Sequence, residues 1–134
     1  MSLSGFWRRM RGYGQPRDEL TIDLAADDQM DLSMAIIGLD DQQLSALGWT
    51  PDRRREVFDA LNAHALDNFN RGVVVGSRNE PIPVRLPEED WKRIFALALI
   101  AKDQFPHSWP IRVIGRIAAE GLKPPRLGQP PAQR

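Results

Sequence analysis

The chain has 134 residues, and its 18 basic and 18 acidic side chains give a formal net charge of zero. Hydrophobic residues make up 42% of the chain and charged residues 27%, which is typical of one ordinary globular domain. The absence of cysteine excludes a disulfide scaffold, a thiolate zinc site and a cysteine nucleophile. The longest unbroken apolar run, residues 94–101, is too short to span a membrane.

The charges are distributed unevenly along the chain. Residues 1–17 carry four arginines and no acid, and residues 18–52 carry nine acids and no lysine or arginine. Residues 53–134 carry fourteen bases against nine acids, a net charge of +5. Such blocks are usually solvated surface, so we expect basic segments of the same fold to compensate the acidic stretch. The alternative is a surface that steers a basic partner or imitates the charge of a nucleic acid.

Residues 1–17 form a basic and aromatic segment. It contains Trp7, Arg8, Arg9 and Arg11, and turn-forming residues follow. It lacks the apolar stretch of a secretory signal, so we expect a cytoplasmic protein. We interpret this segment as flexible, with arginines that anchor carboxylates or phosphates and Trp7 as an apolar anchor.

A strand and a helix are predicted next. Alternating polarity over residues 21–25 indicates a short strand. A helix follows within residues 27–39, with Asp27 or Asp28 as its cap and Gly38 at its end. Three apolar residues at helical spacing share one face of this helix. They are Met30, Met34 and Ile37.

Two further helices are predicted before residue 70. Asp40 with Gln43 three residues later is a capping-box pattern, which predicts a helix that Gly48 ends. Thr50 followed by Pro51 predicts the start of a longer helix that runs to about residue 69. The apolar stripe of this helix consists of Val57, Phe58, Leu61, Ala65 and Phe69.

The next segment predicts a minor β-hairpin-like element near residues 73–86. Its β-branched run at 73–75 and its proline-containing run at 81–86 would form the two strands. Residues 87–105 have the strongest apolar pattern, so we expect a central buried helix that ends before Pro106. Its inward stripe consists of Trp91, Ile94, Phe95, Ala98, Ala101 and Phe105.

The predicted fold is therefore mainly α, with about four helices around the central helix at 87–105 and disordered termini. The last helix covers residues 108–120, and Ile111, Ile114, Ile117 and Ala118 are expected to face inward. Residues 122–134 contain four prolines, which predicts a disordered tail. We expect a flexible segment over 1–17, one helical domain over 18–121 and the proline-rich tail.

No pattern in the chain points to a reaction. There is no glycine-rich phosphate loop, no nucleophile elbow and no pair of histidines at ligand spacing. His64 shares a helix face with Asp67, which predicts a surface ion pair, and His107 lies in a predicted turn where it would pack or cap. We therefore expect no enzyme activity, no cofactor and no metal.

Residues 40–69 have the outline of a helix-turn-helix. Arg53, Arg54 and Arg55 lie in the first turns of the second helix, where cations oppose the helix dipole. A DNA backbone would compensate these charges, because recognition helices present their N-terminal residues to DNA. The acids that flank the three arginines would repel the phosphates and argue against this function.

The sequence favours a non-enzymatic binding or adaptor protein that engages a larger protein through charged and aromatic segments. The candidate partner-binding residues are Trp7, Arg8, Arg9, Arg11, Arg53, Arg54 and Arg55. The alternative is a DNA-binding protein of the helix-turn-helix type that uses the helix starting at Pro51. The first hypothesis predicts that removal of residues 1–17 weakens partner binding more than replacement of the three later arginines. The second hypothesis predicts that replacement of these arginines abolishes binding to DNA.

Overall fold

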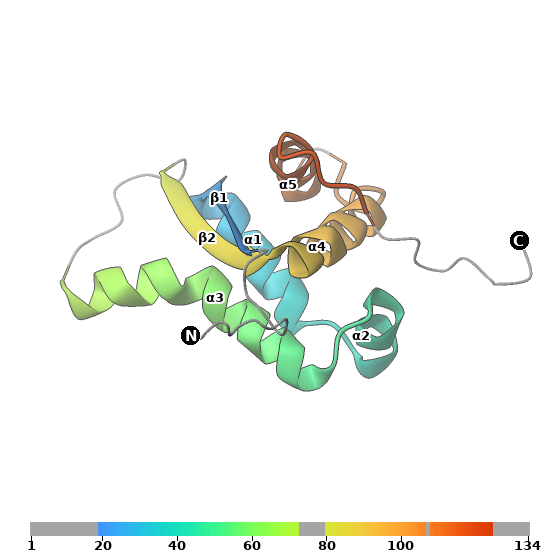
Figure 1. The fold of residues 1–134 in the computed structure, drawn as a ribbon, viewed down its shortest axis with the longest axis horizontal. Helices are drawn as coiled ribbons and strands as arrows, with labels where there is room; N and C mark the ends of the chain where they lie inside the picture. Colours follow the sequence, from blue (N-terminus) through green and yellow to red (C-terminus); the bar gives the residue numbers. More distant parts are fainter. Residues whose placement is uncertain (1–18, 73–79, 107, 125–134) are drawn as a thin grey trace, which may run out of the picture.

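The computed structural model describes residues 19–72, 80–106 and 108–124. Within these ranges the chain forms five helices and one antiparallel sheet of two strands, in the order β1, α1, α2, α3, β2, α4, α5 (Figure 1). The prediction of a mainly helical fold with a minor β element is confirmed. None of the helices in these ranges combines the length and the apolar character that a membrane span requires.

The sheet joins β1 (Glu19–Ala25) to β2 (Pro81–Pro87). Both strands were predicted, and β2 pairs with β1. Residues 73–75, which were predicted to form the other strand of a hairpin-like element, lie outside the described residues. Every second side chain faces the core, because successive residues of a strand point to opposite sides. The buried pairs are Ile22 with Val84 and Leu24 with Ile82. Proline is tolerated in β2, since each strand of a two-stranded sheet is an edge.

The helix α1 (Ala26–Ile37) follows β1 without a loop. The predicted cap at Asp27 or Asp28 is wrong, because Ala25 is the N-cap residue and makes no side-chain cap. The backbone N–H of Ala26 instead donates to the carbonyl of Glu80, at 2.9 Å. Gly38 ends the helix as predicted.

The starts of α2 (Asp41–Leu47) and α3 (Pro51–Asn70) confirm the caps predicted from the sequence. Asp40 Oδ1 accepts a hydrogen bond from the N–H of Gln43 at 2.8 Å, and Gln43 Oε1 accepts one from the N–H of Asp40 at 2.9 Å. The hydroxyl of Thr50 accepts from the N–H of Arg53 at 3.0 Å. Gly48 separates the two helices with a φ of 84°, a left-handed conformation that glycine adopts without strain.

The capping box at Asp40 allows a direct test. Replacing Asp40 by alanine is expected to lower the free energy of unfolding by about 1 kcal/mol, because the N–H of Gln43 loses its acceptor. Asp41 is the matched control, since it is also exposed but does not cap the helix. Chemical unfolding followed by circular dichroism measures both variants, and equal losses would contradict the role of the capping box.

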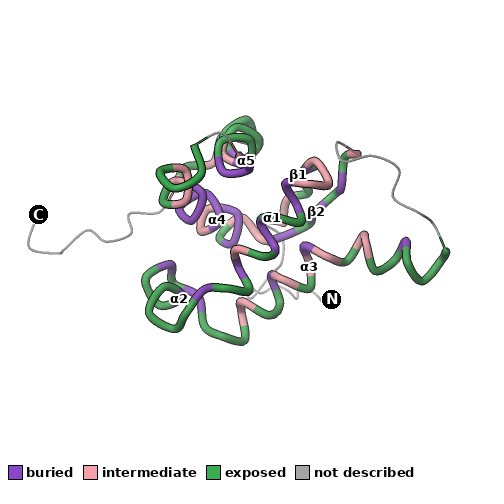
Figure 2. The backbone as a smooth tube through the Cα atoms, turned by 180° about the vertical axis from the view of Figure 1, so that it is seen from behind, coloured by how far each residue is buried: buried purple, intermediate pink, exposed green. Residues whose placement is uncertain are grey.

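The central position predicted for residues 87–105 is confirmed by α4 (Glu88–Ala101), which buries most of its N-terminal and middle residues. Figure 2 shows buried segments concentrated where α4, α1 and the two strands meet. The helix ends earlier than predicted, and Phe105 is 50% exposed instead of lying in the core. The residues after Ala101 form a turn that carries Phe105 out of the buried face.

The exposed faces of α3 and α5 (Trp109–Ala118) also differ from the predicted stripes. The C-terminal half of α3 projects from the remainder of the fold (Figure 1), and Phe69 is therefore 79% exposed. In α5 the buried residues are Trp109, Pro110, Val113 and Ile117, whereas Ile111 and Ala118 are exposed. The sequence of α5 has apolar residues on two faces, and the face that contacts α4 and α1 is the buried one.

Candidate functional site

An apolar groove of about 480 Å³ lies beside the C-terminal ends of α1 and α4, and we call it the α1–α4 groove. Its lining includes Met34, Leu39, Leu97, Ile100, Phe105 and Trp109. Met34 is 62% exposed and Ile100 is 59% exposed, so the groove has large apolar side chains at its surface. Clustered exposed apolar residues on a folded domain indicate a binding surface.

The exposed wall of the groove follows from the way α1 packs. Met30, Met34 and Ile37 are all exposed, so the face predicted from their spacing points away from the core. The opposite face carries Gln29 and Ser33, which are buried against α3 together with apolar neighbours.

Hydrogen bonds explain why these polar residues are buried. The side-chain amide of Gln29 donates to the carbonyl of Leu61 at 2.9 Å and to Asn62 Oδ1 at 3.0 Å. The hydroxyl of Ser33 donates to the carbonyl of Gln29 at 2.9 Å. Because each of these polar side chains has partners, α1 can bury them beside Leu32 and Ile36 and leave its methionines at the surface.

The groove has an acidic side. Asp31 lines it, and the wall formed by α1 and the start of α2 comes from residues 18–52, which contain no lysine or arginine. Asp40 and Asp41 are exposed at the start of α2, next to Gln43 in the lining. On the opposite side Lys102 lies 3.6 Å from Asp103, so its charge is locally balanced. The lining that the described residues form is therefore mainly apolar, with Asp31 as its one charged side chain.

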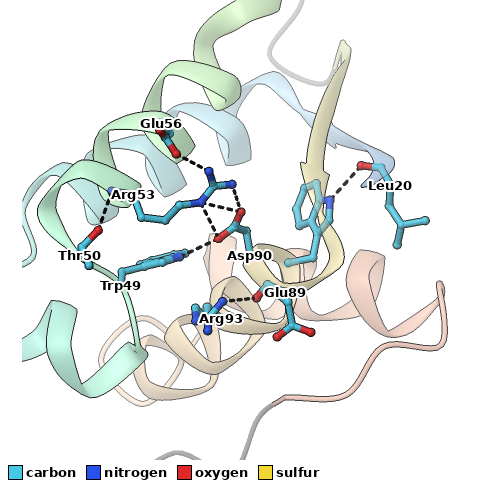
Figure 3. A network of polar contacts seen from close by, with 9 residues as sticks. Leu20, Trp49, Thr50, Arg53, Glu56, Glu89, Asp90 and Arg93 are labelled. Atoms are coloured by element: carbon cyan, nitrogen blue, oxygen red, sulfur yellow. Dashed lines mark hydrogen bonds and ion pairs between the residues drawn. The ribbon is translucent and has the colours of Figure 1, made fainter. Parts of the chain in front are cut away.

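The arginines predicted to bind a partner begin with Arg53, which folds onto a buried acid (Figure 3). Asp90 is 2% exposed, and its carboxylate accepts from Trp49 Nε1 at 2.9 Å and from Arg53 Nε at 3.0 Å. Arg53 also makes ion pairs through its Nη2 with Asp90 and through its Nη1 with Glu56. The hydrogen bond to Asp90 is the largest influence that raises the pKa of Arg53.

The other two arginines of this cluster differ from each other. Arg54 donates from Nη1 to the carbonyl of Leu39 at 2.6 Å and thereby connects α3 to the short segment between α1 and α2. Arg55 is exposed, and no side-chain hydrogen bond or ion pair joins it to another described residue. The helix-turn-helix outline therefore retains one arginine of the three that is not engaged within the fold.

The acidic stretch is compensated in part by later arginines. Asp28 is buried, and Arg112 of α5 binds both of its carboxylate oxygens from Nε at 3.0 Å. This contact is the largest influence that raises the pKa of Arg112. Glu19 pairs with Arg85 at 2.8 Å, across the two strands. These contacts agree with the internal compensation that we expected from the charge blocks.

Several of the residues singled out in the sequence have other placements. Trp7, Arg8, Arg9, Arg11 and His107 lie outside the described residues. Asp67 pairs with Arg71 at 3.2 Å and not with His64 as predicted. In the described part of the chain, no three acidic, histidine or cysteine side chains gather in a way that could hold a metal ion.

The chain was compared with protein families, curated proteins and solved structures. No protein-family model matches the chain, and neither a curated protein nor a solved structure matches it significantly.

Sequence reasoning missed Ile100 and Phe105 as surface residues, because both continue the apolar pattern of the central helix. One signal was present: the segment 94–101 is apolar around its whole circumference, which exceeds what one core face requires. The same reasoning missed Asp90, which lies in the first turn of α4 and could be read there as a favourable charge at a helix start.

Proposed function

We propose that the protein is a cytoplasmic, non-enzymatic adaptor that binds a protein partner through the α1–α4 groove. The observation that carries this proposal is the gathering of Met34, Ile100 and Phe105 at the surface of one apolar groove. An apolar groove on a helical domain is a common receptor for an amphipathic helix or an extended apolar segment. Methionine is well suited to such a site, because its unbranched side chain adapts to ligands of different shape.

The geometry gives less support to DNA binding through α3. Arg53 and Arg54 are engaged within the fold, and the exposed acids Asp52 and Glu56 lie next to them. A phosphate backbone on this surface would therefore meet nearly as much negative as positive charge. Trp7, Arg8, Arg9 and Arg11 lie outside the described residues and remain candidates for binding a partner.

The test is an affinity capture with charges introduced into the groove. Tagged wild-type protein is compared with a Met34→Glu/Ile100→Glu variant, and nuclease-treated lysate of the source cells supplies the partners. We expect the amount of captured partner to fall at least about tenfold. An unpaired charge buried in an apolar interface costs about 1–3 kcal/mol or more, and about 1.4 kcal/mol corresponds to a factor of ten in affinity. Quantitative mass spectrometry measures this loss.

A Leu66→Glu/Phe69→Glu variant is the matched control, because it introduces two charges at exposed apolar positions of α3, away from the groove. The control is expected to capture the same partners as the wild type. Equal capture by the groove variant would contradict the proposal. Capture that disappears with nuclease and weakens in an Arg55→Ala variant would favour DNA binding instead.

A further inference from the structure

The α1–α4 groove and the N-terminal segment of this chain have complementary chemistry. The groove exposes apolar side chains, and its lining among the described residues includes Asp31 but no lysine or arginine. Asp40 and Asp41 are exposed next to Gln43 of the lining. Residues 1–17 carry four arginines and no acid. Phe6 and Trp7 directly precede the first of these arginines, and Met10 lies between Arg9 and Arg11. The segment therefore combines the basic and apolar groups that suit this groove.

We propose that the groove binds residues 6–11 of the same chain. Trp7 is the apolar anchor, and Arg8, Arg9 and Arg11 are attracted to Asp31 and to the exposed carboxylates of Asp40 and Asp41 beside the groove. Tryptophan and arginine are the residue types that most often dominate the free energy of binding at an interface. The contact is within one chain, and it differs from the contacts of Arg53 and Arg54, which bind Asp90 and the carbonyl of Leu39.

The chain is long enough to make this contact. Trp91 Nε1 donates to the carbonyl of Leu20 at 3.1 Å, so the start of β1 lies beside the first turn of α4 (Figure 3). Ile100 follows Trp91 by nine residues on the same helix, a distance of about 14 Å along the axis. Nine residues also separate Arg11 from Leu20, and an extended chain of that length spans about 30 Å.

A short tether makes even weak docking effective. The effective concentration of a segment on a short linker is on the order of a millimolar. A segment that binds the groove with an intrinsic dissociation constant of about a millimolar would then occupy it about half of the time. A partner that uses the groove must displace this segment. The apparent affinity of the partner is therefore reduced in proportion to the fraction of grooves that are free. This last consequence rests on the proposed function, whereas the docking itself does not.

Paramagnetic NMR of the full-length chain tests the contact directly. The chain has no cysteine, so Ser4→Cys creates a single site for a nitroxide label near the proposed anchor. We expect the label to broaden the methyl signals of Met34 and Ile100 strongly and to leave those of Leu66 unaffected. Leu66 is the internal control, because it is 60% exposed on the projecting half of α3. Raised salt should weaken the effect, since part of the attraction is between exposed charges.

Two further samples make the result decisive. A labelled chain that also carries Trp7→Ser and Arg8→Ser is expected to lose the broadening at Met34 and Ile100, and persistent broadening would overturn the role of this anchor. In the second sample, nitroxide-labelled chain without isotopes is mixed with isotope-labelled chain without nitroxide. Broadening there would show that a second copy supplies the segment, which would overturn docking within one chain.

The outcomes separate this proposal from the proposed function. Equal signal intensities at Ile100 and Leu66 in the labelled chain would overturn the docking, even if the groove captures a partner. Strong and specific broadening without any captured partner would support the docking and contradict the adaptor function.

Discussion

Replacing Arg53 by methionine is expected to lower the free energy of unfolding by about 2–4 kcal/mol. The variant leaves the buried carboxylate of Asp90 with Trp49 as its remaining side-chain donor, and breaking a buried ion pair on one side typically costs about 3–5 kcal/mol. We expect a value toward or below the low end of that range, because the side chain of Arg53 is 35% exposed and solvent screens part of the interaction. Urea unfolding followed by circular dichroism measures the change.

Arg55 is the matched control for this prediction. It lies two residues further along the same helix, is exposed, and has no side-chain partner among the described residues. Arg55→Met is expected to change the free energy of unfolding by less than about 0.5 kcal/mol. Similar losses in the two variants would mean that helix propensity or charge density, and not the pair with Asp90, determines the cost.

This comparison also bears on function. An arginine that neutralises a buried carboxylate is retained for folding, whether or not α3 binds anything. A loss of binding in an Arg53 variant would therefore be confounded by loss of structure, whereas Arg55 can be replaced without that complication. Arg55 is for this reason the residue with which DNA binding is best tested.

Replacing Trp91 by alanine is expected to lower the free energy of unfolding by about 3–5 kcal/mol. Trp91 has no exposed surface, and its removal leaves a large cavity between α4 and the sheet. The indole also donates to the carbonyl of Leu20, so the variant removes a polar link between α4 and β1. The same unfolding experiment, with circular dichroism as the signal, measures the loss.

Two companion variants interpret the result for Trp91. Trp91→Phe keeps most of the apolar volume but removes the donor to Leu20, so we expect a smaller loss of about 1–3 kcal/mol. Ile100→Ala, at an exposed position of the same helix, is expected to cost less than about 0.5 kcal/mol. If Ile100→Ala destabilises the protein as much as Trp91→Ala, the groove is part of the core and not a binding surface.

Local signals were sufficient to predict most helix boundaries. The capping box at Asp40, the left-handed glycine at 48 and the Thr50-Pro51 start all depend on residues within a few positions of each other. Such interactions form by the same rules in any fold, because the groups that they satisfy are the free N–H and carbonyl groups of a helix end. The central helix was equally predictable, because the apolar pattern of residues 87–105 is stronger than that of the other predicted helices.

The partners of these elements depend on contacts between distant parts of the chain. A strand pattern states which residues alternate but not which second strand pairs with them, so β1 was not recognised as the partner of β2. In α1 both faces contain apolar residues, and the inward face is selected by hydrogen bonds from Gln29 to Leu61 and Asn62. That selection leaves Met34 at the surface and creates one wall of the groove.

The sequence by itself therefore determined the fold class and the caps of α2 and α3, and only the tertiary structure decided which side chains form the candidate site. Three neighbouring arginines are equivalent in the sequence, yet one meets a buried carboxylate, one a backbone carbonyl, and one no described side chain. The physical reason is that burial and pairing depend on positions in space, since Asp90 lies 37 residues from Arg53 in the chain and in contact with it in the fold. Local chemistry defines the helices, and their packing defines which side chains remain available to bind.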